Sequence, residues 1–219
     1  MIMINCDIGE RGPHHPVDIE LMNYIDIANI ACGGHAGDAV SVSVFKGIAD
    51  SKGVKVTAHL SYPDRINFGR VKTDMKIPDL LDSLEEQYSM LQTGSVKFHG
   101  ALYNDSVTDS ELASALTGWL NKMDVGAIIA PADSEIASFC ADEGIEVITE
   151  AFAERRYNYN SETGRLTLVS RKESHASIIS LEEALEHSRS IIERGVVAAY
   201  AEGMGIKKIM EVPLKAGRI

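Results

Sequence analysis

The chain alternates short apolar runs with longer segments in which apolar residues recur at helical spacing. The short runs predict strands over 2–8, 27–31, 55–59, 95–99, 126–130, 145–152, 196–200 and 208–212. The helical spacing predicts helices over 17–24, 39–52, 78–92, 109–123, 133–142 and 181–194. The segment 158–168, with Gly164 in its middle, is typical of a hairpin. Strands of about five residues that alternate with helices of ten or more favour βαβ units and a parallel sheet.

Polar residues that could carry chemistry follow several of the predicted strands. A doubly wound sheet gathers ligand groups at one crevice, whereas a β/α barrel places a loop from every strand on one shared face. Strand exits are usually rich in Gly, Pro, Asn or Ser, so repeated His and carboxylate residues at these positions favour the barrel. The residues concerned are Asp7, His35, His59, His99, Glu154 and Glu202.

Length, composition and charge narrow the class of protein. With 219 residues, 45% of them hydrophobic, the chain fits a single α/β domain over 1–219. The formal net charge of −11 argues against nucleic acid or an anionic membrane surface as a partner. The opening residues show neither a signal peptide nor a membrane-spanning segment, which indicates a cytoplasmic protein. Three cysteines without C-x-x-C spacing argue against a disulfide framework and a structural zinc site.

The histidines at the strand ends are the main candidates for chemistry. His35 lies in a Gly-rich turn, and Asp38 after it is expected to be the N-cap of the next helix. Imidazole and carboxylate groups side by side support general acid and base catalysis near neutral pH. The catalytic candidates are therefore Asp7, His35, His59, His99 and Glu154.

A metal site is the second interpretation of the same residues. One Asp with two His from different strands is a common arrangement for a divalent metal, here Asp7, His59 and His99. The sequence contains no H-E-x-x-H motif, so the metal-free acid and base site is favoured. The remaining histidines, His14, His15, His175 and His187, are expected to lie in solvent.

Two cationic residues could hold a substrate carboxylate. Arg155 could bind it with two parallel hydrogen bonds, and Lys97 could bind it as a point charge. Lys97 precedes His99 by two residues, which places both side chains on one face of a strand.

Four ordered blocks of sequence carry a family resemblance. Residues 5–10 (Asn-Cys-Asp-Ile-Gly-Glu) and 29–38 (Asn-Ile-Ala-Cys-Gly-Gly-His-Ala-Gly-Asp), with blocks 58–65 and 97–104, closely resemble the signatures of the LamB/YcsF family. The match extends through 152–157 to about residue 199. In bacteria that family supplies the A-type subunit of the 5-oxoprolinase complex. The resemblance implies an irregular seven-stranded β/α barrel of the glycoside hydrolase/deacetylase type. Within these blocks, Asn5, Asp38 and Tyr103 are further candidates for contact with substrate.

The resemblance implies an ATP-dependent opening of 5-oxoproline to glutamate, carried out together with two partner subunits. The sequence has no phosphate-binding loop, so the nucleotide is expected to be handled wholly or partly by the partners. Two alternatives stay open. One is a metal-dependent amide or carbohydrate deacetylase, and the other is a non-catalytic metabolite-binding subunit, suggested by the absence of the family's late His-Gly-Asp block. Whether the chain forms a homo-oligomer is also open.

Overall fold

The computed structural model describes residues 2–201 and 209–214, so the candidate Glu202 lies outside the described residues. The chain divides after Thr149 into two compact units, and each is described by itself. The expectation of one domain over 1–219 stays a prediction.

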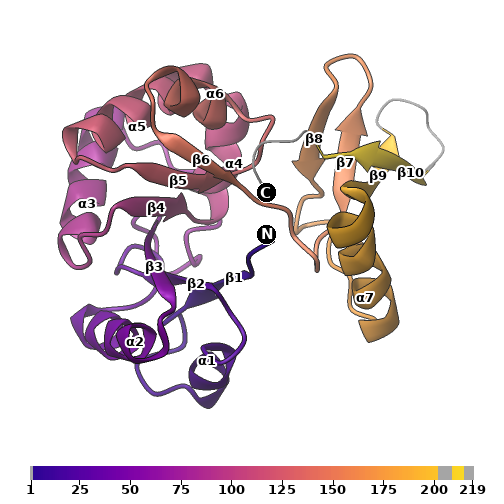
Figure 1. The fold of residues 1–219 in the computed structure, drawn as a ribbon. Helices are drawn as coiled ribbons and strands as arrows, with labels where there is room; N and C mark the ends of the chain where they lie inside the picture. The colour runs from indigo at the N-terminus through magenta and orange to yellow at the C-terminus, as the bar shows by residue number, and fades with distance from the viewer. Residues whose placement is uncertain (1, 202–208, 215–219) are drawn as a thin grey trace. The chain divides into compact units, whose positions relative to one another are not determined.

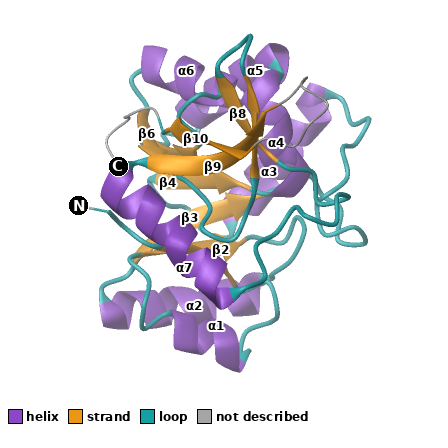
Figure 2. Ribbon diagram, turned by 90° about the vertical axis from the view of Figure 1, so that its right-hand side faces the viewer, coloured by secondary structure: helices purple, strands orange, loops and turns teal. Residues whose placement is uncertain are grey.

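The first unit contains a curled sheet of six parallel strands in sequence order, which forms a half-barrel (Figure 1). This arrangement confirms the α/β class. Figure 2 shows β2, β3, β4 and β6 following one another from α2 towards α6. The strands are β1 (Asn5–Ile8), β2 (Ile27–Ala31), β3 (Lys55–Leu60), β4 (Ser95–Phe98), β5 (Ala127–Ala130) and β6 (Glu146–Thr149). The helices are α1 (Pro16–Leu21), α2 (Ala39–Lys52), α3 (Ile77–Ser89), α4 (Gly100–Thr108), α5 (Ser110–Lys122) and α6 (Glu135–Asp142).

The two faces of this sheet differ in character because successive side chains of a strand point to opposite sides. One face is apolar and buried, and it packs against helices such as α2 and α3. Its residues include Ile8, Ile30, Ala58, Leu60, Val96 and Phe98. The opposite face carries a run of polar residues, namely Asn5, Asp7, Asn29, Thr57, His59 and Lys97. The curled sheet therefore holds polar groups on one side and the hydrophobic core on the other.

Local chemistry explains where α2 begins. Asp38 is its N-cap, as predicted: the carboxylate Oδ1 accepts a hydrogen bond of 2.8 Å from the Ser41 backbone N–H. The Ser41 hydroxyl in turn accepts a hydrogen bond of 2.8 Å from the Asp38 N–H, which completes a capping box.

The sequence pattern predicted no helix over 100–108, yet this segment forms α4. A tertiary contact accounts for the difference. Gly100 has φ +60°, and a Cβ there would lie 2.4 Å from the backbone oxygen of Gly69. Only glycine allows this close approach, and the helix that follows buries Leu102 and Val107.

The second unit is built on a separate sheet of four strands in the order β10-β9-β7-β8. The strands β7 (Tyr157–Asn160) and β8 (Arg165–Leu168) are antiparallel, which confirms the predicted hairpin. The predicted strands near 196–200 and 208–212 form β9 (Val196–Ala201) and β10 (Ile209–Pro213) in this sheet, where β9 runs parallel to β7. A small core of Tyr157, Val197, Ala199 and Val212 holds this sheet together.

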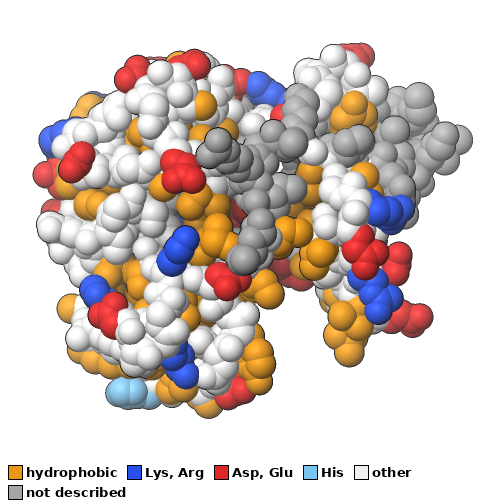
Figure 3. Space-filling view, in the orientation of Figure 1, with side chains coloured by type: hydrophobic (Ala, Val, Ile, Leu, Met, Phe, Trp, Pro, Cys, Tyr) orange, Lys and Arg blue, Asp and Glu red, His pale blue; other side chains and the backbone are white. Residues whose placement is uncertain are grey.

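The helix α7 (Leu181–Arg189) of the second unit continues as a π-helical turn, η1 (Ser190–Arg194). This helix exposes apolar side chains, among them Leu181 and Leu185. Figure 3 shows hydrophobic and charged side chains side by side in the region of this helix. The expectation that His187 is solvated is wrong, because this residue faces inward. It is 6% exposed, and its Nδ1 lies 3.2 Å from the backbone oxygen of Ala153. Among the described helices, none has the length and apolar character that crossing a membrane would require.

Candidate active site

The candidate site lies at the carboxyl ends of β1 to β4. Parallel strands place these ends along one edge of the sheet, so residues that follow different strands meet there. The strand register sets the neighbours: Asp7 pairs with Asn29 across β1 and β2, and His59 pairs with Lys97 across β3 and β4. The structure brings together Asp7, His35, His59 and His99, the four residues that sequence alone placed at one site.

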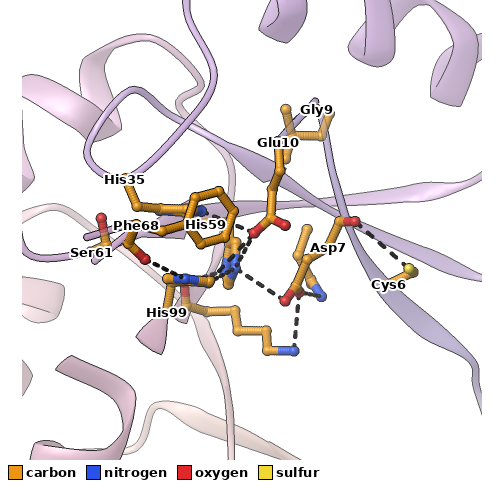
Figure 4. A network of polar contacts seen from close by, with 12 residues as sticks. Cys6, Asp7, Gly9, Glu10, His35, His59, Ser61, Phe68 and His99 are labelled. Atoms are coloured by element: carbon orange, nitrogen blue, oxygen red, sulfur yellow. Dashed lines mark hydrogen bonds and ion pairs between the residues drawn. The ribbon is translucent and has the colours of Figure 1, made fainter. Parts of the chain in front are cut away.

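Three imidazole rings form the centre of the site (Figure 4). The ring of His35 stacks on that of His99, with centroids 3.7 Å apart and planes 3° from parallel. The ring of His59 meets both of them edge-on, at 5.2 Å from His35 and 4.9 Å from His99. All three are buried, with exposed fractions of 2%, 1% and 8% in chain order. Such packing fixes the ring orientations.

The turn that carries His35 has a backbone requirement of its own. Gly37 has φ +78°, and a Cβ at this position would lie 2.2 Å from the backbone oxygen of Ala31. The turn can therefore fold back onto the end of β2 only with glycine at position 37.

Glu10 is the member of the site that sequence reasoning missed. Figure 4 shows its carboxylate directed at the three rings. Its Oε1 lies 3.0 Å from His35 Nε2, 3.5 Å from His99 Nδ1 and 3.9 Å from His59 Nε2. The available signal was a second carboxylate three residues after Asp7, just beyond the end of a predicted strand.

The four side chains Glu10, His35, His59 and His99 could hold a metal ion, because each offers one ligand atom and these atoms lie within 4.8 Å of one another. The sequence suggested a set with Asp7 in place of Glu10 and His35. In the structure Asp7 borders the group, with Oδ2 3.3 Å from His59 Nε2.

A second polar cluster adjoins the rings on the same face of the sheet. Lys97 Nζ donates to Asn5 Oδ1 at 3.1 Å and to Asp7 Oδ1 at 3.3 Å. The Asn29 side-chain amide donates to the same two oxygens, at 2.7 Å and 3.0 Å. Lys97 is almost fully buried, whereas the Asp7 side chain is 31% exposed. Asp7 is thus the charged group of this cluster that solvent can reach.

The surroundings set the protonation of these groups. Burial, reinforced by the neighbouring His59 and His35, lowers the pKa of His99 to about 2. Burial also lowers the pKa of His35, although its hydrogen bond to Glu10 opposes the shift. Burial alone would raise the pKa of Asp7, but His59 and Lys97 hold it well below its usual value. Near neutral pH, Asp7 is ionised while His35 and His99 are neutral.

The backbone around Phe68 completes the site. Phe68 has φ +56°, a conformation that non-glycine residues rarely adopt, and its carbonyl oxygen lies 3.1 Å from His99 Nε2. The phenyl ring meets His35 and His99 edge-on at 5.2 Å and 5.3 Å. Backbone strain of this kind gathers at functional sites.

The other candidates are described by their own surroundings, and their roles in catalysis or substrate binding stay predictions. Asp38 caps α2, and Tyr103 is buried on α4. Glu154 is exposed in the second unit. Within that unit the Arg155 guanidinium donates to the backbone oxygens of Val169 at 2.6 Å and Ala176 at 3.3 Å.

Comparison with known proteins identifies the family. The family model described as "LamB/YcsF family" matches residues 2–210. The chain belongs to the LamB/YcsF family. Relatives in this family named as the A subunit of 5-oxoprolinase include one from Natranaerobius thermophilus, 36% identical over 91% of this chain and 80% of the relative. Another from Pyrococcus abyssi is 34% identical over 90% of this chain and 80% of the relative. One from Bacillus subtilis is 31% identical over 90% of this chain and 79% of the relative.

A solved structure supports the same fold. The lactam utilization protein from Thermus thermophilus superimposes with a TM-score of 0.79 and 27% sequence identity, covering 98% of this chain and 87% of that protein. The relatives named as the A subunit of 5-oxoprolinase support a role for this chain as a 5-oxoprolinase subunit.

Proposed function

We propose that this chain is the A-type subunit of an ATP-dependent 5-oxoprolinase, which opens 5-oxoproline to glutamate together with two partner subunits. The observation that carries the proposal is the match to relatives named as the A subunit of 5-oxoprolinase over about nine tenths of the chain. The site supports it, because a partly exposed carboxylate beside a buried cation can contact a small polar substrate. Dependence on ATP implies a cytoplasmic location.

Opening the ring requires water to add to the lactam carbonyl carbon, the C–N bond to break and the ring nitrogen to gain a proton. An amide of this kind is stable, so ATP with the partner subunits would supply the activation. We assign the proton transfer to Asp7, which takes a proton from the attacking water and delivers it to the ring nitrogen. Lys97 and Asn29 hold one Asp7 oxygen, which leaves the carboxylate oriented in a half-exposed position.

The substrate carboxylate needs a local positive charge, since the chain as a whole carries −11 and repels anions. Lys97 is the candidate at this site because it is the cation beside the proposed base, but its buried ammonium group donates to Asn5 and Asp7 and would have to exchange one of these bonds for the substrate carboxylate. Lys97→Gln should weaken binding of 5-oxoproline by about 1 to 3 kcal/mol, the usual loss for a charge-assisted hydrogen bond. The neutral analogue 2-pyrrolidinone, which lacks the carboxylate, should be nearly insensitive to the change. Equal weakening of both ligands would assign Lys97 to the shape of the site rather than to the carboxylate.

The decisive experiment mixes the purified chain with candidate partner subunits, ATP and 5-oxoproline, and measures glutamate and ADP. Asp7→Asn should reduce turnover by about two to four orders of magnitude, the usual contribution of a general base. Asp50→Asn is the matched control, since Asp50 is an exposed residue of α2 that pairs with Lys46 on the same helix. Absence of glutamate with all partners present, or equal activity of the two variants, would refute the proposal.

A second candidate function is a metal-dependent amide or carbohydrate deacetylase, and the cluster that could hold a metal ion favours it. The two functions differ in their need for ATP. Release of acetate from an acetylated amide or sugar by the chain alone, without nucleotide, would favour the deacetylase. Formation of glutamate only with ATP and partners would favour the 5-oxoprolinase.

A further inference from the structure

We infer that Glu10, His59 and His99 form a binding site for one divalent transition-metal ion such as Zn²⁺, and that His35 holds Glu10 in place. Binding of the ion stands on the geometry alone. A use of the ion in ring opening rests on the proposed function.

The first step is the tautomer of His99. Its Nε2 lies 3.1 Å from the carbonyl oxygen of Phe68. A carbonyl oxygen can only accept a hydrogen bond, so Nε2 carries the hydrogen. The other ring nitrogen of His99, Nδ1, is therefore the one available to a metal ion.

The same reasoning applies to His59. Its Nδ1 lies 3.2 Å from the carbonyl oxygen of Lys97, so this nitrogen carries a hydrogen and Nε2 is the nitrogen available to a metal ion. His59 Nε2 and His99 Nδ1 face each other at 3.0 Å. Two lone pairs at this distance repel unless a cation lies between them. Each histidine also has the arrangement of a typical metal ligand, with its second nitrogen donating to a backbone carbonyl.

The cation could be a proton on His59 Nε2, which also lies 3.3 Å from Asp7 Oδ2, or a metal ion, and Glu10 favours the metal. A proton bridges only two acceptor atoms. Here Glu10 Oε1 is an additional acceptor near the two nitrogen atoms, at 3.5 Å from His99 Nδ1 and 3.9 Å from His59 Nε2. Ligands of a tetrahedral Zn²⁺ with bonds of about 2.0 to 2.1 Å are roughly 3.3 Å apart. The three observed separations of 3.0, 3.5 and 3.9 Å surround that value.

His35 has a supporting position. Its Nε2 lies 3.0 Å from Glu10 Oε1, and its Nδ1 is buried without a hydrogen-bond partner among the described residues. Buried donors without a partner are rarer than buried acceptors without one, which assigns the hydrogen to Nε2, where it donates to Glu10. Stacking on His99 fixes the ring. We therefore place His35 outside the ligand set, as the residue that orients the carboxylate.

The donor set indicates the kind of ion. Two imidazoles and one carboxylate suit Zn²⁺ and neighbouring first-row metals better than Mg²⁺ or Ca²⁺, which prefer oxygen ligands. Three protein ligands leave a position open, as in catalytic rather than structural zinc sites. An ion there would supply a Lewis acid that polarises a carbonyl oxygen.

The test measures binding of Zn²⁺ and Co²⁺ to full-length protein that carries no histidine tag and has been stripped with EDTA. Calorimetry should give one Zn²⁺ per chain, and Co²⁺ should give the visible absorption of a low-symmetry, four-coordinate site. Glu10→Gln and His99→Gln should lower the Zn²⁺ affinity by more than about 100-fold and remove the Co²⁺ absorption. His35→Gln should lower the Zn²⁺ affinity by about 10- to 100-fold, the usual effect of losing a residue that orients a ligand.

The matched control is His14→Gln, because His14 lies outside the cluster and should leave Zn²⁺ binding unchanged. Far-UV circular dichroism of every variant shows whether it folds, and the isosteric Glu10→Gln is the variant expected to keep the fold. Folded wild-type protein that binds neither Zn²⁺ nor Co²⁺, or binding kept by Glu10→Gln and His99→Gln, would overturn the inference. Glutamate formation by a complex that binds no metal would refute the metal site and leave the proposed function standing. Metal binding by a complex that forms no glutamate would support the metal site and refute the proposed function.

Discussion

The buried pair of Lys97 and Asp7 allows a quantitative prediction. Its charged atoms lie 3.3 Å apart, with exposed side-chain fractions of 4% and 31%. At this distance unit charges attract by roughly 5 kcal/mol at an effective dielectric constant near 20, and by roughly 1.3 kcal/mol in water. Because solvent reaches Asp7, we expect a value between these limits, about 2 kcal/mol. Lys97→Met should then lower the free energy of unfolding by about 2 to 3 kcal/mol, near the lower end for breaking a buried pair.

A double-mutant cycle separates this pair from its surroundings. Lys97→Met, Asp7→Asn and the double variant would be unfolded in urea with EDTA present, and their free energies of unfolding compared with the wild type. The double variant should be more stable than the sum of the single losses predicts, by about 2 kcal/mol, because the second change no longer leaves an unpaired charge. Losses that add to within about 0.5 kcal/mol would refute the attraction between the two residues.

Three further predictions concern stability. Phe45 is fully buried on α2, and Phe45→Ala should lower the free energy of unfolding, measured in urea, by about 3 to 5 kcal/mol. Phe45→Leu is the control, and a loss below about 1 kcal/mol for Phe45→Ala would contradict the place of Phe45 in the core. Asp38→Ala removes the N-cap of α2 and should lower the free energy of unfolding by about 1 kcal/mol. Asp38→Ser should lose much less, because Ser is also a good N-cap residue. Burial lowers the pKa of His187, so the unfolded chain binds more protons than the folded chain, and the free energy of unfolding falls as pH drops through about 6.5. His187→Gln should lessen that fall, measured by urea titrations at several pH values. An unchanged pH dependence would exclude His187 as its cause.

The sequence by itself determined the local elements and the edge of the sheet where chemistry gathers. Apolar periodicity located the helix that became α2, and the residue types around Asp38 fixed its start, because capping acts over three residues. The residues Asp7, His59 and His99 could be placed together before any coordinates, since parallel strands in βαβ order bring their carboxyl ends to one edge. The hairpin of β7 and β8 was likewise a local property.

Tertiary structure decided what depends on distances between remote residues. The tautomers of His59 and His99 follow from the carbonyl oxygens of Lys97 and Phe68, which lie 38 and 31 positions away in the chain. Glu10 joined the site because the turn after β1 carries its carboxylate back to His35, 25 positions further on. No pattern of residue types contains such distances. For the same reason α4, which depends on the close approach of Gly100 to the backbone of a remote loop, could not be predicted from its own residues.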